Sequence, residues 1–199
     1  YRVELADGTL VYLNAESELR FPKQFRGKNR KVYLTGEGYF DVQRNEKQPF
    51  IVEAQQVEVR VLGTSFGVRA YTKEENVLTT LIQGRVNVEA DGQQVELNPG
   101  QQADFNRGND RLTVAEVDVE QYVGWKDGRL VFDNKPLEFI LEELGRWYSF
   151  DVFYTNKELK EIPYSLNIKK HEDIAHVLKF IERTGKVKFE VNKNTIIVK

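Results

Sequence analysis

One pentapeptide has the spacing of a catalytic serine motif. Residues 63–67 read G-T-S-F-G, which matches the G-x-S-x-G nucleophile elbow of α/β-hydrolases. That chemistry requires Ser65 to stand on a strained turn from a strand into a helix, with an acid and a histidine later in the chain. The residues that follow, 68–71, alternate as a strand does. We therefore predict that Ser65 lies in a tight structural turn and that this chain is not an enzyme.

Other patterns that could carry chemistry are incomplete. His171 and His176 are five residues apart, whereas two metal ligands on one helix face are four apart. Gly36 and Gly38 form a G-x-G, but a dinucleotide site needs a third glycine and a following helix. No spacing points to a pair of carboxylates of the glycosidase kind, although such a pair stays open. We predict no catalytic, cofactor-binding or metal-binding residues, and no cofactor.

A basic segment lies between two expected strands. Residues 22–31 contain five cations: Lys23, Arg26, Lys28, Arg30 and Lys31. Such a segment could bind an anion or a lipid headgroup, or it could be a solvated loop, which is the interpretation we favour. The formal net charge of the whole chain is −2, which argues against general nucleic-acid binding.

Length and composition indicate a globular protein of one large domain or two small ones. The chain has 199 residues and no cysteine, so disulfides and thiolate zinc sites are excluded. No apolar run approaches the roughly 18 residues that a membrane helix needs. The chain begins at Tyr1 rather than Met. We interpret it as processed or excised, with any membrane anchor upstream.

Residues 1–117 have the pattern of an all-β domain of many short antiparallel strands. Apolar and polar residues alternate in short runs, as in Val57/Val59/Val61 and Val86/Val88, and this period of two puts every second side chain on one face. Asp91-Gly92 predicts a type I′ hairpin. Gly36-Glu37-Gly38 predicts a turn between two strands. A sandwich, an open barrel and a solenoid-like stack all fit this pattern.

The period changes after residue 125, which predicts a small α+β domain over residues 125–199 and a linker over residues 118–124. Apolar residues at helical spacing from Leu137 to Tyr148 and from Ile174 to Ile181 predict two helices. Strand patterns around them give the order β-α-β, then β-α-β-β. Phe139 and Phe180 lie off the main apolar stripes, which predicts that each helix is covered on two sides.

Three motifs in the first domain resemble the periplasmic domain of FecR-type anti-sigma factors. The first is D-G-T-x-V-x-L-N-A-x-S-x-L from Asp7 to Leu19, and the second is R-x-V-x-L-x-G-E-x-Y-F-D-V from Arg30 to Val42. The third is V-L-G-T-x-F-x-V-x-A-Y from Val61 to Tyr71, followed by G-x-V-x-V at 84–88 and L-x-P-G-Q-Q-A at 97–103. The family usually has Asn where this chain has Gly67, and both residues tolerate positive φ.

The second domain resembles the small C-terminal domain of Bacteroidetes FecR-like proteins, which is similar to the short N-terminal domain of secretins and TonB-dependent receptors. The matching residues are W-x-x-G-x-L-x-F from Trp125 to Phe132, P-L-x-x-I-x-x-x-L-x-R-W-Y from Pro136 to Tyr148, and the closing I-x-V at 196–198. In that family the helices lie between two small sheets.

The resemblance implies a periplasmic region of an anti-sigma factor that is anchored in the inner membrane. Its implied partners are the signalling domain of a TonB-dependent outer-membrane receptor and, through a cytoplasmic segment absent from this chain, an extracytoplasmic-function sigma factor. It implies no nucleic acid, and contact with the membrane only through the absent anchor. An alternative is a carbohydrate-binding or cupin-like enzyme domain, which a cleft lined by Tyr and Trp or a cluster of carboxylates would favour.

The end of the chain is our candidate for the partner-binding strand. Residues 195–199 read T-I-I-V-K, and a terminal strand of a small sheet is often an edge with unpaired N–H and C=O groups. Such an edge can accept a strand from another protein. We therefore predict partner binding at Ile196, Ile197 and Val198, the alternative being that this strand pairs internally.

Overall fold

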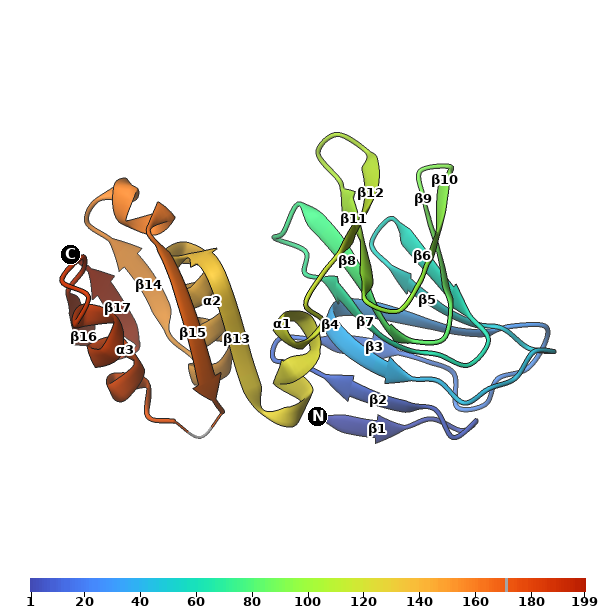
Figure 1. Cartoon of the computed structure of the whole chain (residues 1–199). Helices are drawn as coiled ribbons and strands as arrows, with labels where there is room; N and C mark the ends of the chain where they lie inside the picture. The colour runs from blue at the N-terminus through green and yellow to red at the C-terminus, as the bar shows by residue number, and fades with distance from the viewer. Residues whose placement is uncertain (171) are drawn as a thin grey trace. The chain divides into compact units, whose positions relative to one another are not determined.

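The chain folds as two compact units, Tyr1–Lys126 and Asp127–Lys199, in a computed structural model that describes residues 1–170 and 172–199 (Figure 1). The first unit consists almost entirely of strands, and the second combines strands with two longer helices. This confirms the predicted fold class, an all-β part of many short strands followed by a small α+β part. Each unit is described separately below.

The first unit is one nearly closed sheet of twelve strands. Its main path runs β10-β9-β6-β5-β4-β7-β8-β11-β12, and β1, β2 and β3 join it at β4 and at one another. The strands are β1 Arg2–Glu4, β2 Leu10–Leu13, β3 Glu18–Arg20, β4 Arg30–Asp41, β5 Phe50–Ala54, β6 Val57–Val61, β7 Ser65–Ala70, β8 Asn76–Gln83, β9 Val86–Ala90, β10 Gln93–Leu97, β11 Gln101–Asn106 and β12 Arg111–Glu116.

Strand β4 is the corner of this sheet. Its first half pairs with β3 and β5, and its second half pairs with β2 and β7. The predicted turn at Gly36-Glu37-Gly38 is therefore wrong, because the chain continues as one strand through these residues. Gly36 has φ +93°, a conformation that only glycine adopts freely. The glycine bends the strand so that its two halves serve opposite sides of one core.

The core of the first unit draws on both halves of the sheet. Phe40 stacks on Phe66 with ring centroids 5.2 Å apart, and Phe50 lies beyond Phe40, with ring centroids 6.3 Å apart.

The predicted hairpin at Asp91-Gly92 joins β9 to β10, with φ +47° and +72° at its two central residues. One side chain ties the two ends of the sheet together, because Gln93 accepts from the Leu112 N–H and donates to the Asp110 carbonyl.

The segment expected to be a linker is folded against the first unit. Helix α1 spans Glu120–Val123 and the 3-10 helix η1 spans Gly124–Asp127. Val123 and Trp125 are buried, and a Cβ on Gly67 would meet Val123 at 3.0 Å. Gly67 lies in β7 and is absent from the positive-φ glycines. Close packing against Val123 therefore explains why residue 67 is glycine. The family's Asn at this position suggested a positive φ, which Gly67 does not have.

We expect a protease of broad specificity, such as proteinase K, to cut the native chain first at the Lys126–Asp127 bond and not within residues 118–124. Lys126 is half-buried and Asp127 is exposed, whereas Val123 and Trp125 are buried, and proteases cleave exposed backbone first. Mass spectrometry of the early fragments should find two resistant pieces that meet at this bond. Early cleavage inside β6 to β11 would contradict the division into two units.

The second unit has the predicted order β-α-β, then β-α-β-β. A two-stranded sheet pairs β13 with β15, and a three-stranded sheet has the order β14-β17-β16. Helix α2 contacts both β13 and β14, so it lies between the two sheets as the family resemblance implied. The elements are β13 Arg129–Pro136, α2 Leu137–Tyr148, β14 Asp151–Tyr154, η2 Lys157–Glu161, β15 Pro163–Lys169, α3 Ile174–Glu182, β16 Phe189–Asn192 and β17 Thr195–Val198.

The last strand, β17, is the middle strand of its sheet. It pairs in parallel with β14 and antiparallel with β16 (Figure 1). The prediction that the chain end forms a sheet edge is therefore wrong. Ile196 and Val198 are buried in the core of the unit, and Ile197 is half-buried on the opposite face.

The two helices differ in how they are covered. On α2, Phe139 packs edge-on against Phe132 of β13, with ring centroids 6.3 Å apart. On α3, Val177, Leu178 and Ile181 are buried, but Phe180 is 59% exposed. The expectation of two covered sides is correct for α2 and wrong for α3 at Phe180.

Candidate interaction surface

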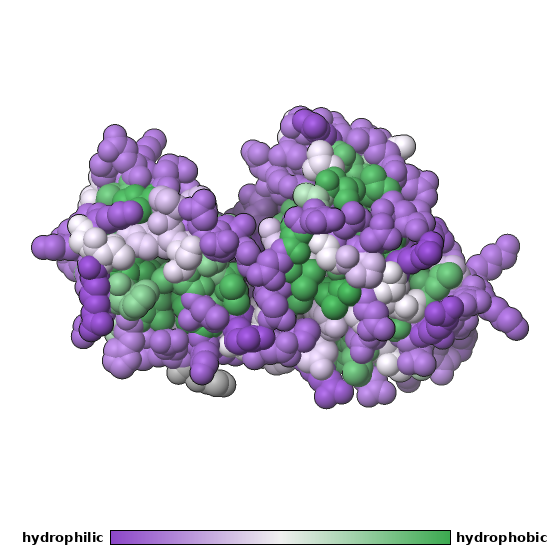
Figure 2. Space-filling model, in the orientation of Figure 1, coloured by the Kyte–Doolittle hydropathy of each residue, from purple (hydrophilic) through white to green (hydrophobic). Residues whose placement is uncertain are grey.

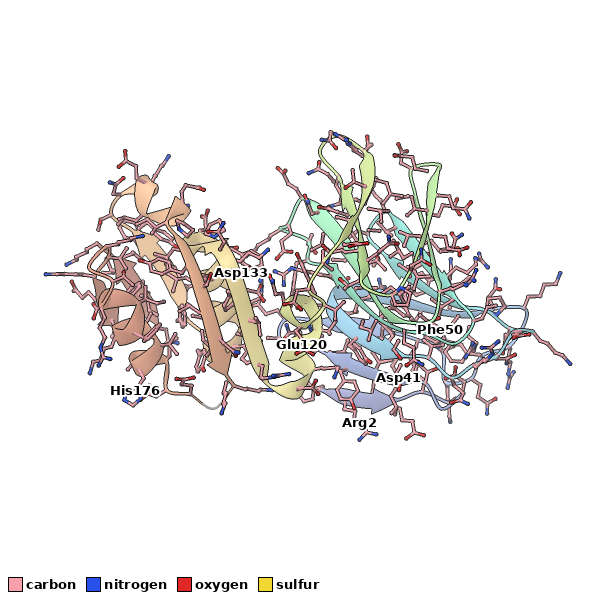
Figure 3. The ribbon with its side chains drawn as sticks, in the orientation of Figure 1. Arg2, Asp41, Phe50, Glu120, Asp133 and His176 are labelled. Carbon is pink, nitrogen blue, oxygen red and sulfur yellow. The ribbon has the colours of Figure 1, made fainter. Side chains whose placement is uncertain are left out.

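Ser65 is a strand residue and not a nucleophile elbow. It opens β7 opposite Asp41 of β4, and its Oγ donates to Asp41 Oδ1 over 2.8 Å; Asp41 is labelled in Figure 3. An elbow would need a helix directly after the serine, whereas strand β7 continues to Ala70. The motif therefore matches the hydrolase motif in sequence but not in structure. Ser65 begins a strand and does not lie in the predicted turn.

Two glycines of the family motifs, Gly63 and Gly84, pack closely against neighbouring residues, and Gly84 also has a positive φ, +98°. A Cβ on Gly63 would lie 2.6 Å from Arg44 Cα, and one on Gly84 would lie 2.8 Å from Thr64 Oγ1. The Thr64 hydroxyl donates to the Arg85 carbonyl over 2.9 Å. The V-L-G-T and G-x-V-x-V motifs thus meet at one point, where Gly84 leaves room for Thr64, whereas Gly63 leaves room for Arg44.

A second group of motif residues forms a buried ionic network. Arg69 donates to both carboxylate oxygens of Glu74, over 2.8 and 2.7 Å, and its Nη1 lies 3.4 Å from Glu37 Oε2. Asn14 donates to the same Glu37 oxygen over 2.7 Å. The Arg69 guanidinium also stands 5.0 Å from the ring centre of Tyr71. The side chains of Arg69 and Glu37 are 9% and 6% exposed, so these charges depend on one another for solvation.

A third group ties the basic segment to the first hairpin. The Arg30 side chain is 1% exposed. It donates to Asp7 Oδ2 over 2.7 Å and to the carbonyls of Gln43 and Gln48 over 2.7 and 2.8 Å. The residues that the family motifs share therefore hold the fold together.

Two clefts open on the first unit. One, of about 550 Å³, is lined by Leu62, Glu96 and three arginines, Arg44, Arg60 and Arg85, each of which already pairs with a glutamate. The other, of about 380 Å³, is lined mainly by acids and amides, among them Glu53, Glu58 and Glu89. Neither cleft is lined by Tyr or Trp, so neither has the stacking surface that a carbohydrate site would use.

The titratable groups do not form a reactive cluster among the residues that the structure describes. No group of three His, Asp or Glu there is placed to hold a metal ion. Burial raises the pKa of the Asp104 carboxyl, which accepts two hydrogen bonds from Asn76 Nδ2 that act in the opposite direction. His176 is exposed on α3 (Figure 3), and His171 lies outside the described residues.

The second unit presents apolar side chains on the outer face of its three-stranded sheet. Phe153 of β14 stands directly opposite Ile197 of β17, and Phe153 is 60% exposed. Glu190 of β16 lies opposite Ile197 on the other side and pairs with Lys199. We call Phe153, Ile197, Glu190 and Lys199 the small-sheet face.

Both outer strands of this sheet have a free edge among the described residues. On β16, the Phe189 N–H donates to the Glu182 side chain over 2.7 Å. Val191 follows two residues later and is 61% exposed. By strand alternation, its N–H points away from β17 as well. The open edge therefore lies at β16 and β14, one strand away from where the sequence placed it.

Of the three predicted partner-binding residues, only Ile197 belongs to the small-sheet face. Ile196 and Val198 point into the core. Sequence reasoning missed Phe153 and Val191. The alternation in 150–154 and 187–191 marked both strands, but nothing local indicated that β17 would insert between them.

The functional context comes from the similarity of this chain to known proteins. Residues 1–87 match the family model described as "FecR protein", and residues 129–198 match the one described as "FecR, C-terminal". Together the two models cover most of the chain, in the predicted order. The chain belongs to the FecR family. No curated protein matches it.

Two solved structures share the whole fold. Both are crystal structures of a protein from Parabacteroides distasonis ATCC 8503 described as a "putative anti-sigma factor". One has a TM-score of 0.91 at 28% sequence identity and covers 100% of this chain and 93% of the other. The second has a TM-score of 0.90 at 28% identity and covers 100% and 92%.

Proposed function

We propose that this chain is the signal-receiving periplasmic region of a FecR-like anti-sigma factor. Membership of the FecR family and the anti-sigma description of its structural neighbours support this role. In the full protein, an inner-membrane anchor and a cytoplasmic segment would link this region to its sigma factor. The incoming signal would be contact with the signalling domain of a TonB-dependent outer-membrane transducer.

The observation that carries the proposal further is the small-sheet face with its open edges. In a sheet that only faces water, the positions of Phe153 and Val191 would normally carry polar side chains. Here both are exposed and apolar, on strands whose outer edges are unpaired among the described residues. A neighbouring strand can add to such an edge through main-chain hydrogen bonds, while side chains on the face supply selectivity. The transducer's signalling domain, itself a small unit of strands and helices, is a partner of suitable shape.

Two observations weigh against the alternative, a carbohydrate-binding or cupin-like enzyme: no Tyr or Trp lines either of the two clefts, and Glu53 and Glu58 of the acidic cleft are both paired with Lys31. The two clefts of the first unit are lined by arginines, acids and amides. The described residues show no cluster of metal ligands. Among them, no helix is both long and apolar enough to cross a membrane.

We expect the 199-residue chain to bind the transducer's signalling domain, and Phe153→Asp to weaken this binding about thirtyfold or more. A well-packed aromatic contact at the centre of an interface is worth about 2 kcal/mol or more, and a buried carboxylate would add a penalty. Isothermal titration calorimetry measures the change directly.

The matched control is Phe180→Asp on α3. Phe180 is 59% exposed and Phe153 is 60% exposed, so the two changes alter charge and exposed apolar area alike at different surfaces. Full affinity in the Phe180 variant, with loss in the Phe153 variant, supports the small-sheet face. Equal affinities of both variants and the wild type would contradict it.

A further inference from the structure

The loop between β3 and β4 collects positive charge that the fold does not neutralise. Between Leu19 and Gly36 there are six cations and no acid, although the whole chain has a net charge of −2. Three of the cations are paired elsewhere: Arg20 with Glu18, Arg30 with Asp7, and Lys31 with Glu53. The other three form what we call the basic loop cluster: Lys23, Arg26 and Lys28. All are exposed, and none has a carboxylate within salt-bridge distance among the described residues.

This loop is held in place by contacts beneath it. The ring of Phe25 packs edge-on against Phe50, which is labelled in Figure 3, with centroids 6.0 Å apart. The Gln48 side chain donates to the Gly27 carbonyl over 2.9 Å, and the Arg30 N–H donates to the Pro49 carbonyl over 2.8 Å. Gly27 has φ +103° and turns the chain at the tip. The three cations are therefore presented by an anchored loop.

An exposed aromatic side chain precedes the cluster in the same loop. Phe21 is 41% exposed, at the start of the same loop. Purple, hydrophilic atoms cover much of the molecular surface in Figure 2, so charge alone does not distinguish this place. The distinguishing feature is that one loop, fixed at Phe25 and Gly27, carries both three cations without carboxylate partners among the described residues and an exposed aromatic ring.

We propose that the basic loop cluster and Phe21 bind the surface of a phospholipid bilayer that carries anionic headgroups. Lys and Arg side chains near such a surface are attracted to its phosphates, each raising the partition coefficient about fivefold. An aromatic ring inserts at the headgroup level. Three cations and one ring give reversible binding that salt weakens. This would be a second membrane contact, in addition to the anchor proposed above, and it does not depend on the transducer.

The test is sedimentation of the 199-residue chain with large vesicles at low salt. One set of vesicles contains phosphatidylcholine alone, and the other equal parts of phosphatidylcholine and phosphatidylglycerol. We expect binding to the second set only, and release on addition of salt. Lys23→Glu/Arg26→Glu/Lys28→Glu should lower the partition coefficient at least a hundredfold. Phe21→Ser should lower it severalfold and leave the salt dependence unchanged.

The matched control reverses three exposed lysines of the second unit: Lys157→Glu/Lys186→Glu/Lys188→Glu. It changes the net charge by the same amount, so retained binding supports a specific surface. Circular dichroism checks that all variants are folded. Equal losses in the two triple variants would overturn the proposal. Failure of the wild type to bind phosphatidylglycerol vesicles would overturn it too, and would leave an acidic protein as the partner of this loop. Release by millimolar inorganic phosphate would also overturn it, because that would indicate a discrete phosphate site.

Discussion

Replacing Arg69 by methionine is expected to lower the free energy of unfolding by about 3–5 kcal/mol. The guanidinium bridges two carboxylates, Glu37 and Glu74, which come from different parts of the first unit. Its removal leaves the Glu37 carboxylate, whose side chain is 6% exposed, without this positive charge, although Asn14 still donates to it. Breaking a buried pair costs more than the pair contributes, since one charge stays buried without its partner.

Urea unfolding followed by circular dichroism measures this loss. The control is Arg85→Met. Arg85 pairs with Glu96 on the surface, where the two side chains are 82% and 57% exposed, and exposed pairs contribute about 0–1 kcal/mol. The double variant Arg69→Met/Glu37→Gln should recover part of the loss, because the buried charge is removed as well. A loss below about 1 kcal/mol for Arg69→Met would show that the network is solvated and not structural.

Gly36→Ala is expected to cost about 3 kcal/mol or more, from two effects that add. The residue has φ +93°, and an L-residue in this region costs about 1–2 kcal/mol. A Cβ there would also lie 2.7 Å from Ser17 Cα. Relieving that contact requires a backbone shift, and overpacking of this kind costs about 1–3 kcal/mol.

The comparison for Gly36 is Gly92→Ala, in the β9–β10 turn. Gly92 also has a positive φ, +72°, but a Cβ there would meet nothing within 4 Å. Only the cost of placing an L-residue at positive φ applies, so we expect the free energy of unfolding to fall by about 1–2 kcal/mol. The difference between the two urea midpoints, at equal m-value, isolates the contribution of the corner of the sheet. Equal costs would mean that β3 moves away without penalty.

Patterns that depend on neighbouring residues were predictable from the sequence. The alternation of apolar residues marked most strands, and Asp91-Gly92 marked its hairpin, because a type I′ turn is determined by its own two residues. The helical spacing in 137–148 marked α2 for the same reason. The order of elements in the second unit followed from these local signals.

Features that depend on distant residues were not predictable. Gly36-Glu37-Gly38 has the composition of a turn, but pairing with β2 and β7 keeps it in strand β4. Residues 118–124 were predicted to be a linker because they have no strand or helix period, but Val123 and the following Trp125 are buried in the first unit. The central place of β17 arises from parallel pairing with β14, more than forty residues earlier. Alternation in a single strand contains no information about its neighbours.

The candidate surface also combines a residue that the sequence predicted with one that depends on distant pairing. Ile197 was predicted because the strand at the chain end was expected to be a sheet edge, whereas its neighbour Phe153 comes from another strand. The family motifs are the most distinctive part of the sequence. Their shared positions include Asn14, Arg30, Glu37 and the close-packed glycines, and none of these shared positions belongs to the small-sheet face. Distinctive residues in this chain are those that the fold needs, whereas the proposed contact residues are ordinary apolar side chains in exposed positions.

The most direct test of signal reception through the second unit is hydrogen–deuterium exchange of the 199-residue chain, with and without the transducer's signalling domain. Addition of a strand would protect outward-facing amides of an edge strand, which otherwise exchange with water. The amide of Asp151 donates to the Asn194 carbonyl, just before β17, and the amide of Thr155 donates to Val198 of β17. By strand alternation, the amides of Val152 and Tyr154 therefore face outward. We predict new protection in β14 (Asp151–Tyr154) at Val152 and Tyr154, or in β16 (Phe189–Asn192) at Val191, with residues 1–126 unchanged. Protection confined to residues 1–126, with no change in the second unit, would contradict the account.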